Sequence, residues 1–368
     1  MTIDPICDVS IAVELLLDGR LVVFPTETVY GLGGRVDSDT TIEAIFAAKG
    51  RPADNPLIVH VTSVEMARRY AFVGAVEEAL LNAFAPGPLT VICPVRAGTL
   101  SSRVTGGGMT VAVRIPQSEI ALELIRRVDC GLAAPSANRS GRPSPTDAEH
   151  ACAEMEGRVA AVLDGGTCRV GIESTVACWN GEEVLVLRPG AITGQALNAV
   201  ADAVVPERRR NMRRDDGFPA ETRHESHRTV RSPGTRYRHY APAVPVFLFD
   251  NLCEVPRSGT GDIKSGTACI CTEATAKNLC GIPGPLRQSG SSTASAGEDS
   301  TGFGPHSERR SNGTLITFAS FELLSANLYR WLWKLEGSVS AIWIELPPDL
   351  PEFQGLRDRL LRAAERNG

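Results

Sequence analysis

The chain has 368 residues and a formal net charge of −5, and 43% of its residues are hydrophobic. This length is about twice that of an average domain, so we expect two domains, each large enough to bury a core. A weakly acidic composition offers no overall basic surface for nucleic acid, and the sequence lacks the run of about 18 apolar residues that a transmembrane helix needs. These features predict a soluble, cytoplasmic protein.

The first part of the chain, residues 1–205, alternates apolar runs with helical patterns and turns rich in Gly and Pro. Strands are expected at residues 21–24, 57–61, 90–95, 110–115, 130–136, 160–166, 174–179 and 183–188. Helices are expected at residues 10–19, 39–49, 63–70, 74–84, 117–128 and 146–154. This order predicts one α/β or α+β domain built on a large twisted mixed sheet.

The composition changes at residue 206. Residues 206–242 are rich in arginine and poor in aliphatic side chains, which predicts a linker that cannot fold alone. Residues 243–368 predict a small α/β, Rossmann-like domain, with a disordered insertion at about 283–313, where Ser and Gly dominate. The strands of this domain are expected at 244–249, 267–272, 314–318 and 340–346, and its helices at 320–335 and 353–366.

Several well-known catalytic motifs are absent from the sequence. It contains no P-loop, no dinucleotide-binding G-x-G-x-x-G after a strand, no G-x-S-x-G elbow and no H-E-x-x-H. Its ten cysteines include no C-x-x-C pair, so we interpret them as buried, reduced thiols. We therefore expect no protein-bound metal and no covalent nucleophile. The polar groups that remain suit chemistry by positioning and charge neutralisation, such as nucleotidyl transfer.

Four charged or titratable side chains stand where expected helices or strands end. Lys49 and Arg51 begin the proline-stiffened turn "KGRPADNP", where they either stabilise a helix C-terminus or face a phosphate. His60 lies at the end of an apolar strand and is either a core residue or a ligand contact. Arg114 ends the strand "TVAVRI" and needs an acidic partner, which is either an internal carboxylate or the carboxylate of a ligand.

Two loops after expected strands are rich in hydrogen-bonding groups. The loop "AAPSANRSGRPSPT" holds more donors than a plain connection needs, which favours ligand binding over a surface turn. In "VVFPTETVYGLGG", Glu27 and Tyr30 either face a ligand or only brace a Pro/Gly turn. Ser174 and Arg188 add polar groups at further strand ends. Together these segments predict one binding site built from groups at strand ends.

Eight motifs in series resemble the YrdC-type domain of the threonylcarbamoyl-AMP synthase family. They read "PTETVYGLG", "KGRPADNPLIVHV", "PGPLTVI", "VAVRIP", "APSANRSGRPSPT", "VLDGG", "IESTV" and "LRPGAI". The later "SPGTRYRHYAP" is similar to the segment that joins this domain to the smaller C-terminal domain of the long form, although Thr235 stands where methionine is usual. The resemblance covers residues 10–242 by motif and residues 243–368 by position and pattern.

The resemblance implies a nucleotidyltransferase reaction. L-threonine, bicarbonate or CO2, and ATP with Mg²⁺ give L-threonylcarbamoyl-AMP and pyrophosphate, the first step of threonylcarbamoyladenosine formation in tRNA. The implied partners are these small molecules and a downstream tRNA threonylcarbamoyl transferase machinery, with at most a weak contact to tRNA and none to a membrane. No covalent enzyme intermediate is implied.

The resemblance also assigns residues to ligands. It implies that L-threonine is surrounded by Thr28, His60, Arg114, Ala134 and Ser174. It implies that ATP is held by Arg51, Asn55, Thr110, Ser136, Asn138, Ser144 and Arg188, and by Ser232 and Tyr237 of a lid in the linker. Lys49 and Arg51 are then the residues that stabilise charge during the reaction.

Two other functions compete with this interpretation. The chain could be an RNA-binding or regulatory YrdC-like module without catalysis, using the arginines at 208–214, but that segment has few aromatic residues for stacking on bases. It could also be a carbamoyl-transfer domain of the hydrogenase-maturation type, which shares the fold. The absence of paired C-x-x-C motifs disfavours that third interpretation.

Overall fold

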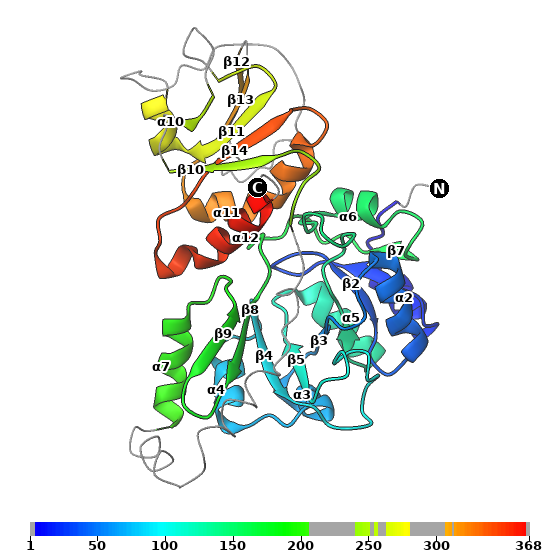
Figure 1. The fold of residues 1–368 in the computed structure, drawn as a ribbon. Helices are drawn as coiled ribbons and strands as arrows, with labels where there is room; N and C mark the ends of the chain where they lie inside the picture. Colours follow the sequence, from blue (N-terminus) through cyan, green and yellow to red (C-terminus); the bar gives the residue numbers. More distant parts are fainter. Residues whose placement is uncertain are drawn as a thin grey trace.

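A computed structural model describes residues 4–205, 240–250, 254–256, 263–279, 306–310 and 313–365. The linker residues 206–239, with the predicted lid residues Ser232 and Tyr237, and most of the insertion expected at 283–313 lie outside these ranges. The described strands form two separate sheets (Figure 1). No helix within the described ranges is long and apolar enough to cross a membrane.

The first domain is built on a nine-stranded mixed sheet with the order β7-β1-β2-β6-β3-β5-β4-β8-β9. Its strands are β1 Val22–Phe24, β2 Gly31–Arg35, β3 Ile58–His60, β4 Leu89–Pro94, β5 Thr110–Arg114, β6 Leu132–Ala133, β7 Ala161–Val162, β8 Thr175–Trp179 and β9 Val184–Arg188. The parallel pairs are β1 with β7, β3 with β5, and β4 with β8. The large mixed sheet expected from the sequence is confirmed.

Helices pack against this sheet and bury one continuous apolar core. They are α1 Val9–Leu17, α2 Asp39–Lys49, α3 Val64–Tyr70, α4 Ala75–Phe84, α5 Glu119–Val128, α6 Ala148–Met155 and α7 Gly194–Val204. The helix α2 begins after Ser38, whose hydroxyl accepts a hydrogen bond from the amide of Thr41, and ends at Gly50 with φ of 60°. These are common start and stop signals of helices, so the sequence placed α2 correctly.

The strand β2 and the helix α7 were not expected from the sequence. Glycine is depleted in strands, so the Gly-rich run after Tyr30 was interpreted as a turn. In the fold this run lies against bulky neighbours: a Cβ on Gly33 would be 2.7 Å from the Phe24 ring, and one on Gly34 would be 2.5 Å from Thr41. The glycines are therefore required for close packing within the sheet and under α2.

The second domain is a five-stranded sheet with the order β10-β14-β11-β13-β12. Its elements are β10 Val246–Phe249, β11 Thr267–Thr272, α10 Glu273–Leu279, β12 His306–Arg310, β13 Gly313–Phe318, α11 Phe321–Leu335, β14 Ala341–Glu345, the 3₁₀ turn Pro351–Phe353 and α12 Gln354–Ala364. All pairs are parallel except β12 with β13. The end of the expected insertion is thus an edge strand, because backbone pairing with β13 does not require an apolar sequence.

The two domains meet through α11 and α12 of the second domain (Figure 1). Arg142 binds both carboxylate oxygens of Glu336, at 2.8 and 2.6 Å. The ring of His150 stacks on Trp333, with centroids 4.7 Å apart. A buried cluster around Arg359 makes a third contact, which lies directly behind the candidate site.

Candidate functional site

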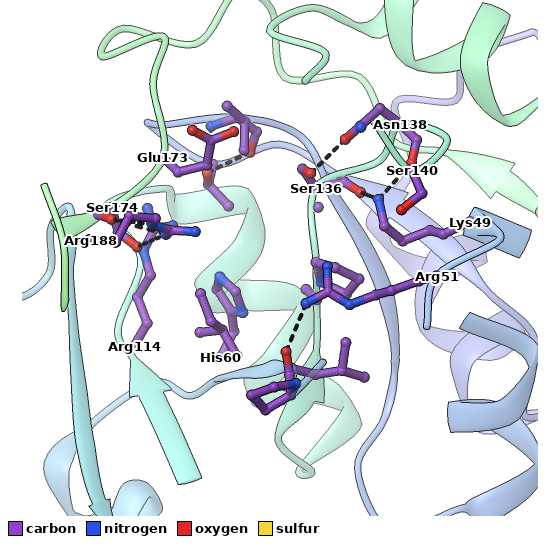
Figure 2. A pocket seen from close by; sticks show the side chains of 18 of the residues that line it. Lys49, Arg51, His60, Arg114, Ser136, Asn138, Ser140, Glu173, Ser174 and Arg188 are labelled. Atoms are coloured by element: carbon purple, nitrogen blue, oxygen red, sulfur yellow. Dashed lines mark hydrogen bonds between the residues drawn. The ribbon is translucent and has the colours of Figure 1, made fainter. Parts of the chain in front are cut away.

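One pocket in the described structure gathers most of the residues predicted for binding (Figure 2). Its wall includes Lys49, Arg51, His60, Arg114, Ala134, Ser136, Asn138, Ser174 and Arg188. Its other polar lining residues are Thr26, Ser140, Glu173 and Tyr240. Four cationic side chains and one carboxylate therefore line this pocket, which favours an anionic ligand.

The strand order explains how distant residues meet here. His60 and Arg114 end the parallel strands β3 and β5 and are register partners, so both side chains reach the same edge of the sheet. Lys49 is the last residue of α2, and Ser174 immediately precedes β8. The edge where parallel strands end is where ligands bind in many α/β sheets.

Lys49 and Arg51 line the side of the pocket next to the loop after β6 (Figure 2). The buried ammonium of Lys49 donates to the carbonyl oxygens of Ser136 and Asn138. Burial, with the nearby charge of Arg51, lowers the pKa of Lys49 well below its usual value. Arg51 donates to Oδ1 of Asn55 at 2.6 Å and so is braced by a residue that sequence reasoning assigned to ATP.

The loop after β6 is held by its own side chains. The hydroxyl of Ser136 donates to Oδ1 of Asn138 at 2.5 Å, and the Asn138 amide donates to the carbonyls of Arg139 and Arg142. Ser144 is buried and donates to Oε1 of Glu173 at 2.6 Å. The hydrogen-bonding side chains that the sequence places in this loop therefore fix its shape, and Ser136 and Asn138 also line the pocket.

Arg114 forms the buried ion pair that the sequence left open. Its Nη2 donates to Oε1 of Glu27 at 2.7 Å, with 4% and 2% of the two side chains exposed. Oε2 of Glu27 accepts a hydrogen bond of 3.0 Å from the backbone amide of Gln117. Nε of Arg114 is buried and has no hydrogen-bond partner among the described residues. Glu27 is therefore the internal carboxylate partner of Arg114, which is one of the two alternatives that the sequence left open for this arginine.

His60 is a neutral polar group in the pocket wall. Burial, together with the charge of Arg114, lowers its pKa to about 3. The Phe24 ring meets the imidazole edge-on at 5.9 Å, and Nδ1 of His60 has no partner in the described part of the chain. An uncharged imidazole beside a fixed guanidinium can accept or donate a hydrogen bond without adding charge.

Arg188 and Ser174 form a second polar group in the wall. The guanidinium of Arg188 donates to the carbonyl and the hydroxyl of Ser174, at 2.9 and 3.1 Å from Nη2. That hydroxyl also shares a hydrogen bond of 2.7 Å with Thr90. Burial lowers the pKa of Arg188 from its usual value. Both residues are held rigidly, which suits the binding of a ligand without reorganisation.

Four predicted residues lie behind or beside the wall rather than in it. Thr28 is fully buried and shares a hydrogen bond of 2.9 Å with Thr26, which lines the pocket in its place. Asn55 and Ser144 brace Arg51 and Glu173 from behind. Thr110 begins β5, at the opposite end of that strand from Arg114.

Sequence reasoning did not assign Glu173 or Tyr240 to the site. Glu173 was visible within the motif "IESTV", but its partners come from the second domain and could not be read locally. Tyr240 directly follows residues 206–239, which lie outside the described ranges, and has a φ of 73°, which is rare for a residue with a side chain. Its ring stacks on Tyr329 at 5.6 Å.

A metal site made of protein side chains is not found in the described ranges, which hold no group of three or more His, Cys, Asp or Glu suited to an ion. The eight cysteines within those ranges are free, and burial raises the pKa of the Cys178 thiol to about 11. The pocket instead presents cations, hydroxyls, amides and backbone groups. Such a site can bind anions and stabilise charge that develops on a phosphate.

Residues 14–190 match a family model described as telomere recombination, and residues 192–365 match the model of the threonylcarbamoyl-AMP synthase C-terminal domain. The threonylcarbamoyl-AMP synthase of Bacillus subtilis (strain 168) is 40% identical over 256 residues, which are 69% of this chain and 69% of that protein. That of Pyrococcus abyssi (strain GE5 / Orsay) is 41% identical over 243 residues, 66% of this chain and 68% of that protein. The crystal structure of P. abyssi Sua5 complexed with L-threonine has a TM-score of 0.72 and 31% identity, covering 97% of this chain and 94% of that one.

Proposed function

The chain belongs to the threonylcarbamoyl-AMP synthase family, and we propose that it joins L-threonine, CO2 or bicarbonate, and ATP into L-threonylcarbamoyl-AMP, releasing pyrophosphate. The observation that carries this proposal is the pocket itself, in which Lys49, Arg51, Arg114 and Arg188 converge around hydroxyls and amides. A module that only binds RNA would not need three buried cations, Lys49, Arg114 and Arg188, beside a neutral histidine. The P. abyssi structure with L-threonine supports threonine as a substrate.

The pocket offers two sides for two ligands. Arg114 and His60, at the ends of β5 and β3, suit an amino acid, because Nε of Arg114 is a buried donor that a carboxylate can satisfy. Lys49 and Arg51, with the Ser136 and Asn138 loop, suit the phosphates of ATP. Arg188 and Ser174 lie on the remaining wall, where both ligands come within reach.

The reaction proceeds by positioning. The amine of threonine forms an N–C bond with CO2 and loses a proton, and a carbamate oxygen then forms a bond to the α-phosphorus of ATP while the bond to pyrophosphate breaks. Negative charge grows on the pyrophosphate oxygens, where Lys49 and Arg51 stabilise it. No side chain of the protein forms a covalent bond to a substrate in these steps. We propose that the product passes to a downstream tRNA threonylcarbamoyl transferase.

Mg²⁺ enters this proposal as part of the MgATP substrate. Mg²⁺ commonly keeps several waters and is bound through phosphates with few protein ligands. The pocket fits that arrangement, because the described ranges hold no cluster of acidic ligands and the pocket carboxylate, Glu173, is occupied by Ser144 and by groups of the second domain. The ion would screen the phosphates while the cations of the wall orient them.

A pyrophosphate-release assay tests the proposal. With ATP, Mg²⁺ and bicarbonate, the protein should release pyrophosphate only when L-threonine is added. Arg51→Gln should lower the rate, whereas Arg69→Gln, which removes a surface cation that is paired with Asp129 and 53% exposed, should not. Release without threonine, or no release with it, would contradict the synthase assignment. In that case a nucleic-acid-binding role would be tested with RNA instead.

A further inference from the structure

Glu173 connects the pocket to the second domain. Its side chain lines the pocket, yet Oε2 accepts hydrogen bonds from the Tyr329 hydroxyl at 3.0 Å and from Nε of Arg359 at 2.7 Å. Tyr329 lies in α11 and Arg359 in α12. The Arg359 side chain is fully buried, and its Nη1 also donates to the Pro189 carbonyl of the first domain at 3.0 Å. The second domain therefore delivers a charged group directly behind the pocket wall.

The other oxygen of Glu173 leads into the loop that faces the ligand. Oε1 accepts a hydrogen bond of 2.6 Å from the Ser144 hydroxyl, and the oxygen of that hydroxyl lies 3.5 Å from Oδ1 of Asn138. The same Oδ1 accepts a hydrogen bond from Ser136 at 2.5 Å. A continuous chain of polar contacts thus runs from α12 to two residues of the pocket wall. A displaced Glu173 would remove the brace that the loop receives through Ser144.

We infer that Arg359 is a positioning residue of the synthase pocket: by fixing Glu173 it holds the loop of residues 136–144 in its ligand-binding shape, so the second domain completes the site. The inference rests on the proposed function only in its kinetic test, which measures pyrophosphate release. Arg359 is not a lining residue of the pocket and acts through Glu173. This role is more than holding the two domains together. Arg359 bonds a residue, Glu173, whose side chain also lines the pocket.

The charges around Glu173 give this role a pH signature. Burial by itself raises the pKa of Glu173, but Arg359 and then Arg188 outweigh it and hold the pKa at about 2. The titratable or charged groups that face Glu173 from the surrounding elements are Arg359, Arg188, Tyr329, Tyr240 and Lys49. Without the charge of Arg359, the effect of burial is less opposed and the pKa rises. A protonated Glu173 would lose an acceptor that its partners require.

A second ion pair between the same domains provides a matched control. Arg142 and Glu336 form two short bonds across the domain contact, and Glu336 is not a lining residue of the pocket. Arg142 keeps a partner in Glu154, at 3.0 Å, when Glu336 is neutralised. Arg142 belongs to the loop of residues 136–144 but does not line the pocket, so Glu336→Gln weakens the contact between the domains while Glu173 keeps its partners.

The experiment compares Arg359→Gln, Arg359→Lys and Glu336→Gln in the full chain. The measurements are kcat and KM in pyrophosphate release from pH 5 to pH 9, and the Kd of a nonhydrolysable ATP analogue with Mg²⁺. We expect Arg359→Gln to lower kcat/KM about tenfold or more and to move the acid limb of the pH profile toward neutral pH, as losing a hydrogen bond to a charged group predicts. Arg359→Lys should return the acid limb most of the way to its position in the natural chain. The kcat/KM of Glu336→Gln should stay within about twofold of that of the natural chain.

Equal effects of Arg359→Gln and Glu336→Gln, or an unmoved acid limb in Arg359→Gln, would overturn the inference. Tyr329→Phe provides the test if Arg359→Gln does not fold, because it removes only the hydroxyl that donates a hydrogen bond of 3.0 Å to Glu173. That variant should weaken binding of the ATP analogue several-fold, and unchanged binding would overturn the inference. An inactive natural chain would contradict the proposed function instead, and the analogue Kd would still compare the variants.

Discussion

Neutralising Glu27 should both unfold the first domain more easily and weaken threonine binding. The ion pair of Glu27 with Arg114 has an N–O distance of 2.7 Å and is almost fully buried. At an effective dielectric constant of about 20, the attraction is about 6 kcal/mol before desolvation is subtracted. Removing one partner of such a pair typically costs about 3–5 kcal/mol, because the other charge stays buried. We expect Glu27→Gln to lower the free energy of unfolding by about 3 kcal/mol or more.

Glutamine cannot replace both functions of this carboxylate. Oε1 accepts a hydrogen bond from Arg114, and Oε2 accepts one from the backbone amide of Gln117. The side-chain NH2 of a glutamine would therefore face a hydrogen-bond donor at one of these two positions. Urea denaturation followed by circular dichroism measures the loss of stability. The control is Glu78→Gln, since Glu78 pairs with Arg68 at the same 2.7 Å but with side chains 39% and 40% exposed. Surface pairs contribute about 0–1 kcal/mol, so equal losses in the two variants would refute the reasoning.

Three further predictions concern other parts of the first domain. Arg114→Ala should raise the KM for threonine roughly ten- to a hundredfold and that for ATP much less, and equal increases would show that Arg114 serves a different ligand. Gly33→Ala should lower the thermal midpoint, because its Cβ would be 2.7 Å from the Phe24 ring and such overpacking costs about 1–3 kcal/mol; an unchanged midpoint would contradict the packing. Burial lowers the pKa of His150 to about 4 from 6.5, so its contribution to stability is present above pH 6.5 and is lost as the pH falls toward 4. His150→Phe keeps a ring against Trp333 and should reduce this acid-induced loss by about 3 kcal/mol, as acid titration of the unfolding free energy would show; an identical loss would refute it.

Much of the first domain was predictable because its signals are local. The strands that carry His60 and Arg114 are short apolar runs, and α2 lies between a serine cap and a left-handed glycine. Such patterns depend on neighbouring residues alone, so they survive without knowledge of the fold. The strand β2 was missed for the same reason, because glycine has little strand preference of its own and Phe24 packs on it from another strand.

The candidate site was predictable to the extent that its residues stand at strand ends or in motifs. The sequence by itself determined that cations, a histidine and a donor-rich loop stand where helices and strands end. The tertiary structure decided which groups meet: Arg114 with Glu27, 87 positions away, and Arg359 with Glu173, 186 positions away. Several acids could neutralise either arginine, and pairing depends on which one the packed sheets and helices bring within about 3 Å. That choice is a property of the whole fold, and it brings groups of the second domain against Glu173 of the pocket wall.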